Sequence, residues 1–394
     1  MKNILKIGTG FLLGIILLAN SGNVQATDGT TDKPAIGPEG IPVTDVFFSS
    51  HSGSPHSYSM LTAAQKADLD GNGYLSDKEL QLVTRMYIPV LKESPEATAA
   101  GIAIQYTKED FSFDFRGVEY FTYLREIRVD QTMGRESADG SYTPEWKNCE
   151  YLYGLPNLAT IELDGGNVTT FNPGQCKALR SLTYNKITGF STLSFQRNTT
   201  LRYLYITGSD QLKTVNINNL KILRKLQIMD CKKLTTVNAS KNNKFLYDVD
   251  FINLPKLKKV PFSNFKKVTR LIVSNTPKMK KLKIKKLKKL KELTLVAKKM
   301  KKIDLTRNSK LSTVLIDGQK KGITILLPKK NSILSFKAQN AKLDDKKASA
   351  LVKMLNKKKL QSIDLQHNKI KKINLRGFVA LTSVNMDAKV SVSR

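Results

Sequence analysis

One short segment decides the fold of this chain. It contains two apolar clusters, Leu201-Arg202-Tyr203-Leu204-Tyr205-Ile206 and Leu212-Lys213-Thr214-Val215-Asn216-Ile217. Apolar residues at the first, fourth and sixth positions predict a short strand with one buried and one exposed side. The first cluster recurs, mostly every 21 to 23 residues, from Leu124, Leu158, Leu179, Leu201, Leu223, Leu246, Val268, Leu290, Leu311, Ile333, Leu360 and Leu381. Because neither strand can bury its apolar side alone, we expect about 12 repeats to stack in parallel around one core.

This pattern resembles the leucine-rich repeat, so we expect an α/β leucine-rich-repeat solenoid over residues 124–394. Met279-x-x-Leu282-x-Ile284 predicts a second strand like that of the Leu212 cluster. The interval from Ile333 to Leu360 is longer, and Asp344-Asp345 followed by Ala348, Leu351, Val352 and Leu355 predicts an N-capped helix there. The segment Asn340 to Asn368 resembles the helical repeats of ribonuclease-inhibitor-like proteins. Ile303 to Asn308 resembles the short repeats of secreted bacterial leucine-rich-repeat proteins.

A second motif precedes the repeats. Residues 68–79 match an EF-hand loop, in which Asp68, Asp70, Asn72, Tyr74 through its carbonyl, Ser76 and Glu79 supply oxygen ligands for Ca²⁺. Gly73 permits the sharp turn, and Leu75 is expected to pack inward. Leu61–Ala67 and Leu80–Tyr87 are predicted as the flanking helices. The alternative is an acidic, glycine-rich linker between helices. A lone EF-hand is expected to bind Ca²⁺ with a Kd of ~10⁻⁴ to 10⁻³ M. Calcium is then expected to stabilise the structure more than to switch it between states.

The residues from Ile41 onward resemble the N-terminal cap of secreted Firmicute leucine-rich-repeat proteins, where one EF-hand-like loop precedes a phrase like Gly117 to Leu124. The predicted organisation is a signal peptide over residues 1–26, a flexible leader over 27–40, a cap over 41–123 and the solenoid over 124–394. The segment Glu93 to Phe115 has no recognisable equivalent in the cap that the rest of this region resembles. The export signal without a lipid-modified cysteine or a wall-sorting motif indicates a secreted, extracellular protein.

Composition indicates a folded chain, since 40% of residues are hydrophobic and 25% charged. The net charge of +32 is uneven: residues 27–150 hold 11 basic and 20 acidic side chains, and residues 151–394 hold 52 and 13. The repeat length aligns lysines into columns. These are Lys221, Lys244, Lys266, Lys288 and Lys310; Lys233, Lys256, Lys278 and Lys299; and Lys259, Lys281 and Lys302.

Aligned lysines repel one another, so a polyanion that neutralises them would be favoured. Teichoic acid of a bacterial wall is the first candidate and host glycosaminoglycan the second. Nucleic acid comes third because the columns lack interleaved aromatic residues. Charge would also retain the protein at the cell wall. The alternative interpretation is a solvated surface that only provides solubility.

The strand positions between the buried apolar residues form the concave face of such a solenoid. We expect this face to bind a protein ligand through Tyr203, Tyr205, Met229, Ile272, Val296 and Leu315. No catalytic motif is present, and His51, His56 and His367 are interpreted as surface residues. Cys149 and Cys176 are candidates for a disulfide, although buried structural thiols are favoured for all three cysteines, including Cys231. The sequence thus predicts a secreted, non-enzymatic recognition protein. The alternative is a structural wall-associated protein with no specific ligand.

Overall fold

The computed structural model describes residues 40–43, 58–89, 102–103, 112–130, 145–169, 171–196, 198–297, 300–318 and 322–394. The expected signal peptide, nearly all of the leader, His51, His56, Lys299 and most of Glu93 to Phe115 lie outside these residues. The chain divides into two compact units. The first comprises the described residues up to Ala159 together with 171–178, and the second comprises 160–169 and 179–394.

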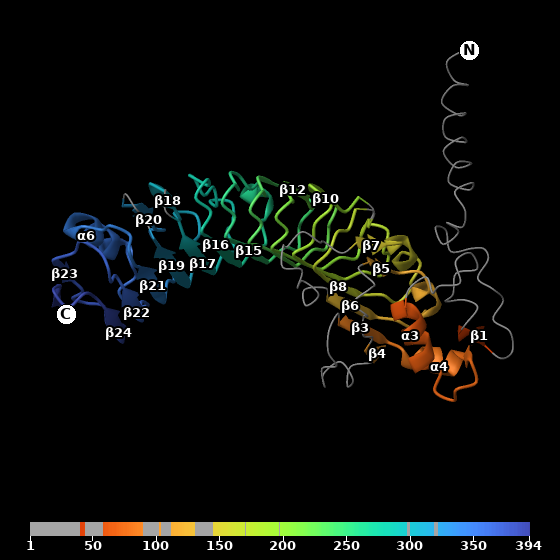
Figure 1. The fold of residues 1–394 in the computed structure, drawn as a ribbon. Helices are drawn as coiled ribbons and strands as arrows, with labels where there is room; N and C mark the ends of the chain where they lie inside the picture. Colours follow the sequence, from red (N-terminus) through yellow and green to blue (C-terminus); the bar gives the residue numbers. More distant parts are fainter. Residues whose placement is uncertain are drawn as a thin grey trace, which may run out of the picture. The chain divides into compact units, whose positions relative to one another are not determined.

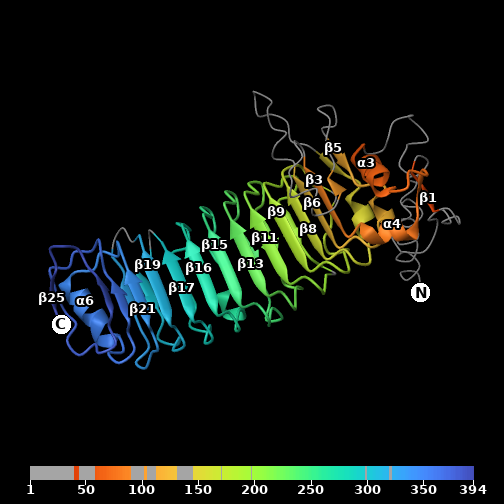
Figure 2. The ribbon, with the colours of Figure 1, turned by 90° about the horizontal axis from the view of Figure 1, so that it is seen from below.

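The second unit is a parallel β-solenoid (Figures 1 and 2). Its long sheet consists of parallel strands in sequence order. They are β8 (Thr160–Asp164), β9 (Ser181–Asn185), β11 (Tyr203–Thr207), β13 (Lys225–Met229), β15 (Asp248–Ile252), β16 (Arg270–Ser274), β17 (Glu292–Val296), β19 (Thr313–Asp317), β21 (Ser335–Ala338), β22 (Ser362–Asp364) and β24 (Ser383–Asn385). The repeat length sets the register, so that Tyr203 lies opposite both Ser181 and Lys225. The expected solenoid is confirmed, with strand predominating over helix.

The core of the solenoid comes from the apolar positions of the repeat. Leu201, Leu204 and Ile206 are fully buried, and so are their equivalents in the next repeat. Buried asparagines complete the turns before the strands: Asn243 Nδ2 donates to the carbonyl oxygens of Ile217 (2.7 Å) and Leu220 (3.0 Å) in the preceding turn. The same carbonyls also accept the Leu220 and Leu223 N–H groups, so the Asn243 amide supplies each with a second donor and links neighbouring turns.

A second, shorter row of strands lies on the opposite side of the core and is discontinuous. β10 (Thr192–Ser194), β12 (Thr214–Asn216) and β14 (Thr236–Asn238) form one sheet. Two pairs follow farther along: β18 (Lys302–Asp304) with β20 (Thr324–Leu326), and β23 (Lys372–Asn374) with β25 (Ser391–Ser393).

The strand predicted at Met279 to Ile284 is wrong, although Met279, Leu282 and Ile284 are buried as expected. Pro261 in the preceding turn has no N–H to continue a ladder, and the chain turns there into the 3₁₀ helix η4 (Phe262–Asn264). Lys281 also shares its column with other lysines, which opposes close pairing.

The helix expected after Asp344 is confirmed as α6 (Asp345–Met354). The Asp344 side chain accepts a hydrogen bond from the Lys347 N–H at 2.8 Å, which is the expected N-cap. Ala348, Leu351 and Val352 are buried on its apolar side.

The first unit contains residues 68–79, for which the sequence predicts an EF-hand loop. α3 (Tyr58–Ala67) leads into the loop, β1 (Ile41–Pro42) pairs with β2 (Tyr74–Leu75), and α4 (Asp77–Leu82) follows. Further along are η1 (Val118–Tyr120), η3 (Cys149–Leu152) and two groups of parallel strands. One group is β3 (Arg85–Pro89) with β4 (Ile102–Ala103) and β6 (Glu126–Asp130), and the other is β5 (Ser112–Asp114) with β7 (Glu145–Lys147).

The helix predicted over Leu80–Tyr87 is wrong in its second half. α4 ends at Leu82, and Arg85–Pro89 form β3 instead. This strand pairs with β6 from Arg85 opposite Glu126 onward, and Met86 is 1% exposed. Tertiary pairing therefore overrides a helical pattern that the sequence alone suggests. No helix in the described ranges is both long and apolar enough to span a bilayer.

The three cysteines are free and buried. Burial raises the pKa of the Cys231 thiol to about 12, and it raises that of Cys176 as well. The interpretation as buried structural thiols is confirmed.

Candidate calcium loop and binding surfaces

The loop between α3 and α4 gathers three carboxylates. One oxygen from each of Asp68, Asp70 and Glu79 lies within 4.8 Å of the others. Backbone donors fold the loop around these groups: the N–H groups of Asn72 and Gly73 donate to the Asp68 carboxylate at 3.1 and 2.9 Å. The result is a tight turn with its acidic oxygens directed to one centre. A hard cation that prefers oxygen ligands suits such a set.

Glu79 joins the two ends of the loop. Its Oε1 accepts from the Leu69 N–H at 2.7 Å, and its Oε2 accepts from the Ser76 N–H at 2.8 Å and from Ser76 Oγ at 2.7 Å. Ser76 Oγ in turn accepts from the Glu79 N–H, which forms a capping box at the start of α4. Burial raises the pKa of Glu79, but the hydrogen bonds from Ser76 and Leu69 outweigh it and the net pKa is lowered. The carboxylate is thus held charged in the position of a bidentate ligand.

A short strand supports the far side of the loop. Ile41 lies opposite Leu75 and Pro42 opposite Tyr74, and the Val43 N–H donates to the Gly73 carbonyl at 2.9 Å. In an antiparallel ladder, hydrogen-bonded and non-hydrogen-bonded pairs alternate. Pro42–Tyr74 is therefore a non-bonded pair, and the Tyr74 carbonyl points away from β1. The Tyr74 carbonyl is therefore directed away from the ladder, as the predicted ligand role requires. Leu75 is fully buried, as its position in the loop predicts.

The remaining two predicted ligands also lie in this loop but are engaged in local bonds. Asn72 Oδ1 accepts from the Tyr74 N–H at 2.7 Å, and Ser76 caps α4. All six predicted ligands offer an oxygen atom to a metal ion, five from side chains and one from a backbone carbonyl, so the chemistry of the loop fits Ca²⁺. The sequence did not indicate that Ile41–Pro42 would supply the second strand that a paired EF-hand normally provides.

The exposed face of the long sheet, hereafter the sheet face, carries the six residues expected to bind a protein. Tyr203 and Tyr205 stand together on β11. Met229 lies beside Ile252 in the register of β13 and β15, an apolar neighbour that the sequence analysis left out of the set. Farther along the sheet, Ile272 and Leu315 share one column with a threonine between them, and Val296 lies in the next column. All of these side chains are half-buried.

A charged cluster lies on β13, β15 and β16, the strands that also carry Met229, Ile252 and Ile272. Arg270 Nη1 lies 2.6 Å from Asp248 Oδ1 and 2.9 Å from Asp250 Oδ1, and Lys225 Nζ lies 3.6 Å from Asp248 Oδ2. The Asp250 side chain is only 6% exposed. Burial raises the pKa of Asp250 despite the opposing effect of Arg270. Lys225 also lies 5.4 Å from the centre of the Tyr205 ring, which joins the cluster to the aromatic pair.

A column of left-handed residues follows the strands and was missed by the sequence analysis. Asp230, Asn253 and Asn275 have φ angles of 55°, 53° and 49°, which asparagine and aspartate tolerate better than other non-glycine residues. Their side chains bond to one another along the stack: Asn253 Nδ2 donates to Asp230 Oδ1 at 2.8 Å, and Asn275 Nδ2 donates to Asn253 Oδ1 at 3.0 Å. The signal was present as a polar residue directly after each strand.

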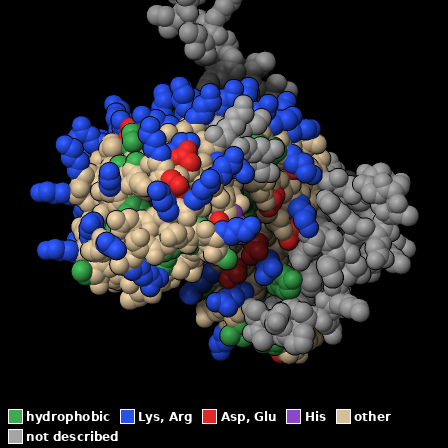
Figure 3. Space-filling view, turned by 90° about the vertical axis from the view of Figure 1, so that its left-hand side faces the viewer, with side chains coloured by type: hydrophobic (Ala, Val, Ile, Leu, Met, Phe, Trp, Pro, Cys, Tyr) green, Lys and Arg blue, Asp and Glu red, His purple; other side chains and the backbone are tan. Residues whose placement is uncertain are grey.

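The predicted lysine columns lie on exposed turns and on the second row. Every described member is exposed, and none forms an ion pair with a described carboxylate. Lys221, Lys244 and Lys288 occupy equivalent turns, because the N–H of each donates to the carbonyl two residues before it. In the view of Figure 3, lysine and arginine side chains crowd along the upper rim, the side where β18 and β20 lie in Figure 1, with few acidic side chains among them.

Comparisons with known proteins identify the fold and nothing finer. A scan against models of protein families gives no match, and no curated protein is significantly similar in sequence. Among solved structures, an internalin (InlF) of Listeria monocytogenes is similar over 88% of this chain and 97% of its own, with 15% identity and a TM-score of 0.50. The functional domain of InlJ of the same organism, which includes a cysteine ladder, covers 90% of this chain and 72% of its own at 14% identity and a TM-score of 0.39. The architecture is that of a leucine-rich-repeat solenoid.

Proposed function

We propose that this leucine-rich-repeat solenoid is a secreted, non-enzymatic recognition protein. It binds an anionic polymer through its lysine columns and a protein partner on its sheet face, and its first unit binds Ca²⁺ in residues 68–79. One observation carries the proposal. Carboxylates pair the basic groups of the central sheet face, but no described carboxylate pairs the lysines of the columns.

The lysine columns are suited to a polyanion because their charges are aligned and uncompensated. Neighbouring turns are ~4.8 Å apart, so each ammonium group lies in the field of the next. Two unit charges at a similar distance repel by about 1 kcal/mol in water, before screening by salt. A chain of phosphates or sulfates would relieve this repulsion and release its own counterions. Wall teichoic acid is our first candidate and host glycosaminoglycan the second.

The sheet face is suited to a protein partner because it combines half-buried apolar side chains with an ordered charged centre. Tyr203 and Tyr205 lie on one side of the Arg270 cluster, Ile252 and Ile272 lie on the strands that carry the cluster, and Leu315 lies beyond it. Aromatic and aliphatic anchors around fixed charges are typical of protein interfaces. The half-buried Asp248–Arg270–Asp250 cluster would fix the orientation of the partner more than its affinity.

Salt dependence of binding tests the polyanion. Lys259, Lys281 and Lys302 are replaced together by Gln, and binding to teichoic acid and to heparin is measured by titration calorimetry at several salt concentrations. On nucleic-acid precedent each lost contact reduces the slope of log K against log salt by ~0.7 to 0.9. The triple variant should therefore lose up to about 2 to 3 units of slope.

The matched control removes the same charge elsewhere. Lys232 and Lys285 are already paired with Asp210 and Asp304 at 2.7 Å, and Lys66 lies in the first unit, so replacing these three by Gln should leave the slope nearly unchanged. Equal loss from both triple variants would show that only net charge matters. Absence of binding by the wild-type protein at physiological salt would leave the columns as a solubility device and reject the proposal.

A substitution on the sheet face tests the protein partner. Ile252→Lys introduces a positive charge among the aliphatic residues of the sheet face. The control, Val379→Lys, introduces the same charge outside the sheet face, at a residue that is 81% exposed. Pull-downs from bacterial wall extract and from host-cell lysate should yield a protein that the Ile252 variant fails to retain and the Val379 variant retains. A partner retained equally by both variants would place the interface elsewhere.

A further inference from the structure

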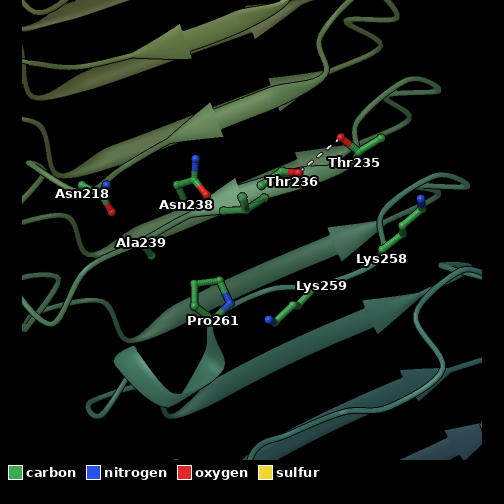
Figure 4. A pocket seen from close by; sticks show the side chains of 9 residues that line it. Asn218, Thr235, Thr236, Asn238, Ala239, Lys258, Lys259 and Pro261 are labelled. Carbon is green, nitrogen blue, oxygen red and sulfur yellow. Dashed lines mark hydrogen bonds between the residues drawn. The ribbon is translucent and has the colours of Figure 1, made fainter.

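An open groove of about 780 Å³ lies on the second row of the solenoid, between β14 and residues 258–261 (Figure 4). Thr236 forms a parallel bridge with Lys259, so the register places Asn238 opposite Pro261. Because proline has no N–H, the ladder cannot continue, and the chain diverges into η4. Asn264 Nδ2 donates to the Ala239 carbonyl at 2.7 Å and fixes the far side. The opening is therefore set by the course of the backbone after Lys259 together with the Asn264–Ala239 hydrogen bond.

The polar lining of the groove consists of hydroxyl, amide and ammonium groups, and Val237, Ala239 and Pro261 form its apolar part. Thr235 and Thr236 present hydroxyls 3.3 Å apart, and Lys258 and Lys259 present the two cations. In Figure 4, Lys259 extends toward Pro261 and Lys258 lies at the opposite end beside Thr235. The lining contains no carboxylate and no aromatic ring. These groups suit a ligand that carries both hydroxyls and an anion, and they do not suit a base that needs stacking.

Four of the lining side chains have spare binding capacity. No side-chain hydrogen bond of Asn218 or Asn238 is found within the described ranges, and neither Lys258 nor Lys259 has a carboxylate partner there. Asn218 is held in place through its backbone, since its carbonyl accepts from Ser240 Oγ at 2.8 Å and its N–H donates to Asn216 Oδ1 at 3.1 Å. The amide side chains are thus positioned yet available to a ligand.

The groove also marks a change in the chemistry of the second row. Thr192, Thr214 and Thr236 stand in register across β10, β12 and β14, and Lys259 continues the same column. The threonine column and the lysine column therefore meet at this point. A polymer lying along the row would contact the threonine hydroxyls first and the lysine ammonium groups next, and the change falls where the strands separate.

We propose that this groove is a subsite for one unit of a hydroxyl-rich anionic chain, a polyol phosphate or a sulfated sugar. Its anionic group binds Lys259, its hydroxyls bind Thr236, Asn238 and Asn218, and Lys258 at the opposite end binds the anionic group of the adjoining unit. The volume lies within the 300–1,000 Å³ typical of ligand pockets and is larger than a single phosphate needs. This proposal rests on the polyanion binding proposed above and adds selectivity for the hydroxyls of the polymer.

The experiment uses charge-neutral changes, so that electrostatic attraction is constant. The full chain carrying Thr236→Val and Asn238→Ala is compared with wild type and with Thr214→Val, a matched change one turn away in the same column and outside the groove. Three probes are titrated at one salt concentration: a short glycerol phosphate oligomer, a short heparin oligosaccharide and an inorganic polyphosphate of similar charge without hydroxyls. The double variant should bind the better of the first two probes about 10-fold more weakly, as expected for two lost hydrogen bonds.

The same variant should bind polyphosphate like wild type, and Thr214→Val should bind all probes like wild type. The probe that shows the loss identifies the polymer as a polyol phosphate or a sulfated sugar. If polyphosphate binds but the double variant loses no affinity for either hydroxyl-bearing probe, the subsite is overturned while the lysine columns stand. An equal loss for polyphosphate also overturns it. If none of the probes binds the wild-type protein, the proposed polyanion function fails together with the subsite.

Discussion

Replacing Glu79 by Gln should abolish stabilisation of the first unit by calcium. Binding to the folded loop stabilises that unit by RT ln(1 + [Ca²⁺]/Kd), which is ~1.4 kcal/mol at a tenfold excess over Kd and ~2.7 kcal/mol at a hundredfold excess. Gln keeps one acceptor oxygen but loses the charge and the bidentate geometry. The variant should therefore lose most of this increment.

The same substitution should also weaken the calcium-free protein. Glu79 accepts three hydrogen bonds that join the Leu69 and Ser76 ends of the loop, at 2.7, 2.8 and 2.7 Å. Loss of the charge-assisted bonds should lower the free energy of unfolding by about 1–3 kcal/mol in the presence of a chelator. The variant thus combines a lower melting temperature with a missing calcium response.

Fluorescence of the only tryptophan provides a local assay. Trp146 lies in the first unit, is 2% exposed and stacks on Phe115 with ring centres 5.7 Å apart. Thermal unfolding followed by this signal, with calcium and with chelator, reports on that unit without interference from the solenoid. Asp77→Asn is the control, since Asp77 is a neighbouring carboxylate that bonds Gln81 and Tyr123 and is not a predicted ligand. An equal calcium-induced shift in wild type and the Glu79 variant would refute the site, as would loss of the response in the Asp77 variant.

Three further substitutions test the architecture. Gly40→Ala places a Cβ 2.4 Å from the Leu75 carbonyl oxygen at a φ of 114°, so it should break the β1–β2 pairing and weaken calcium binding several-fold in a calorimetric titration; unchanged affinity would mean that the strand does not support the loop. Asn243→Ala removes the amide hydrogen bonds to the Ile217 and Leu220 carbonyls, each of which keeps one backbone donor, and should lower the free energy of urea unfolding by about 1–3 kcal/mol, whereas a loss below about 0.5 kcal/mol would contradict the role assigned to its side chain. Arg270→Met leaves the 4% exposed Asp250 without its guanidinium partner and, because the Arg270 side chain is itself 37% exposed, should destabilise the protein by about 1–3 kcal/mol, with recovery when Asp250 is also changed to Leu; no recovery would show that the loss is steric.

Much of the fold could be predicted from the repeat. The spacing of leucines such as Leu201 and Leu204 determines which residues are buried, and the constant repeat length determines the parallel register. The N-capped helix after Asp344 was predictable because its cap and its apolar spacing are both local. The lysine columns followed from the same periodicity, and the structure finds their described members exposed as expected.

Other features depend on partners distant in sequence. Arg85–Pro89 form a strand only because β6 lies beside them, and no local pattern shows that. Ile41–Pro42 pair with Tyr74–Leu75 of the 68–79 loop across more than 30 residues of chain. The Asp248–Arg270–Asp250 cluster requires that successive strands stack with a fixed register, which brings residues 20 and 22 positions apart within hydrogen-bond distance.

The sequence by itself therefore determined the solenoid, its buried rows and the clustering of carboxylates in residues 68–79, because each depends on spacing within one short segment. Only the tertiary structure decided where the second row breaks. Pro261 is an ordinary turn residue until its register against Asn238 is known, and then its missing N–H becomes a groove between β14 and the lysine column. Local periodicity fixes which side chains are buried or exposed, whereas a binding site also needs the distances between turns, and these are set only when the turns stack.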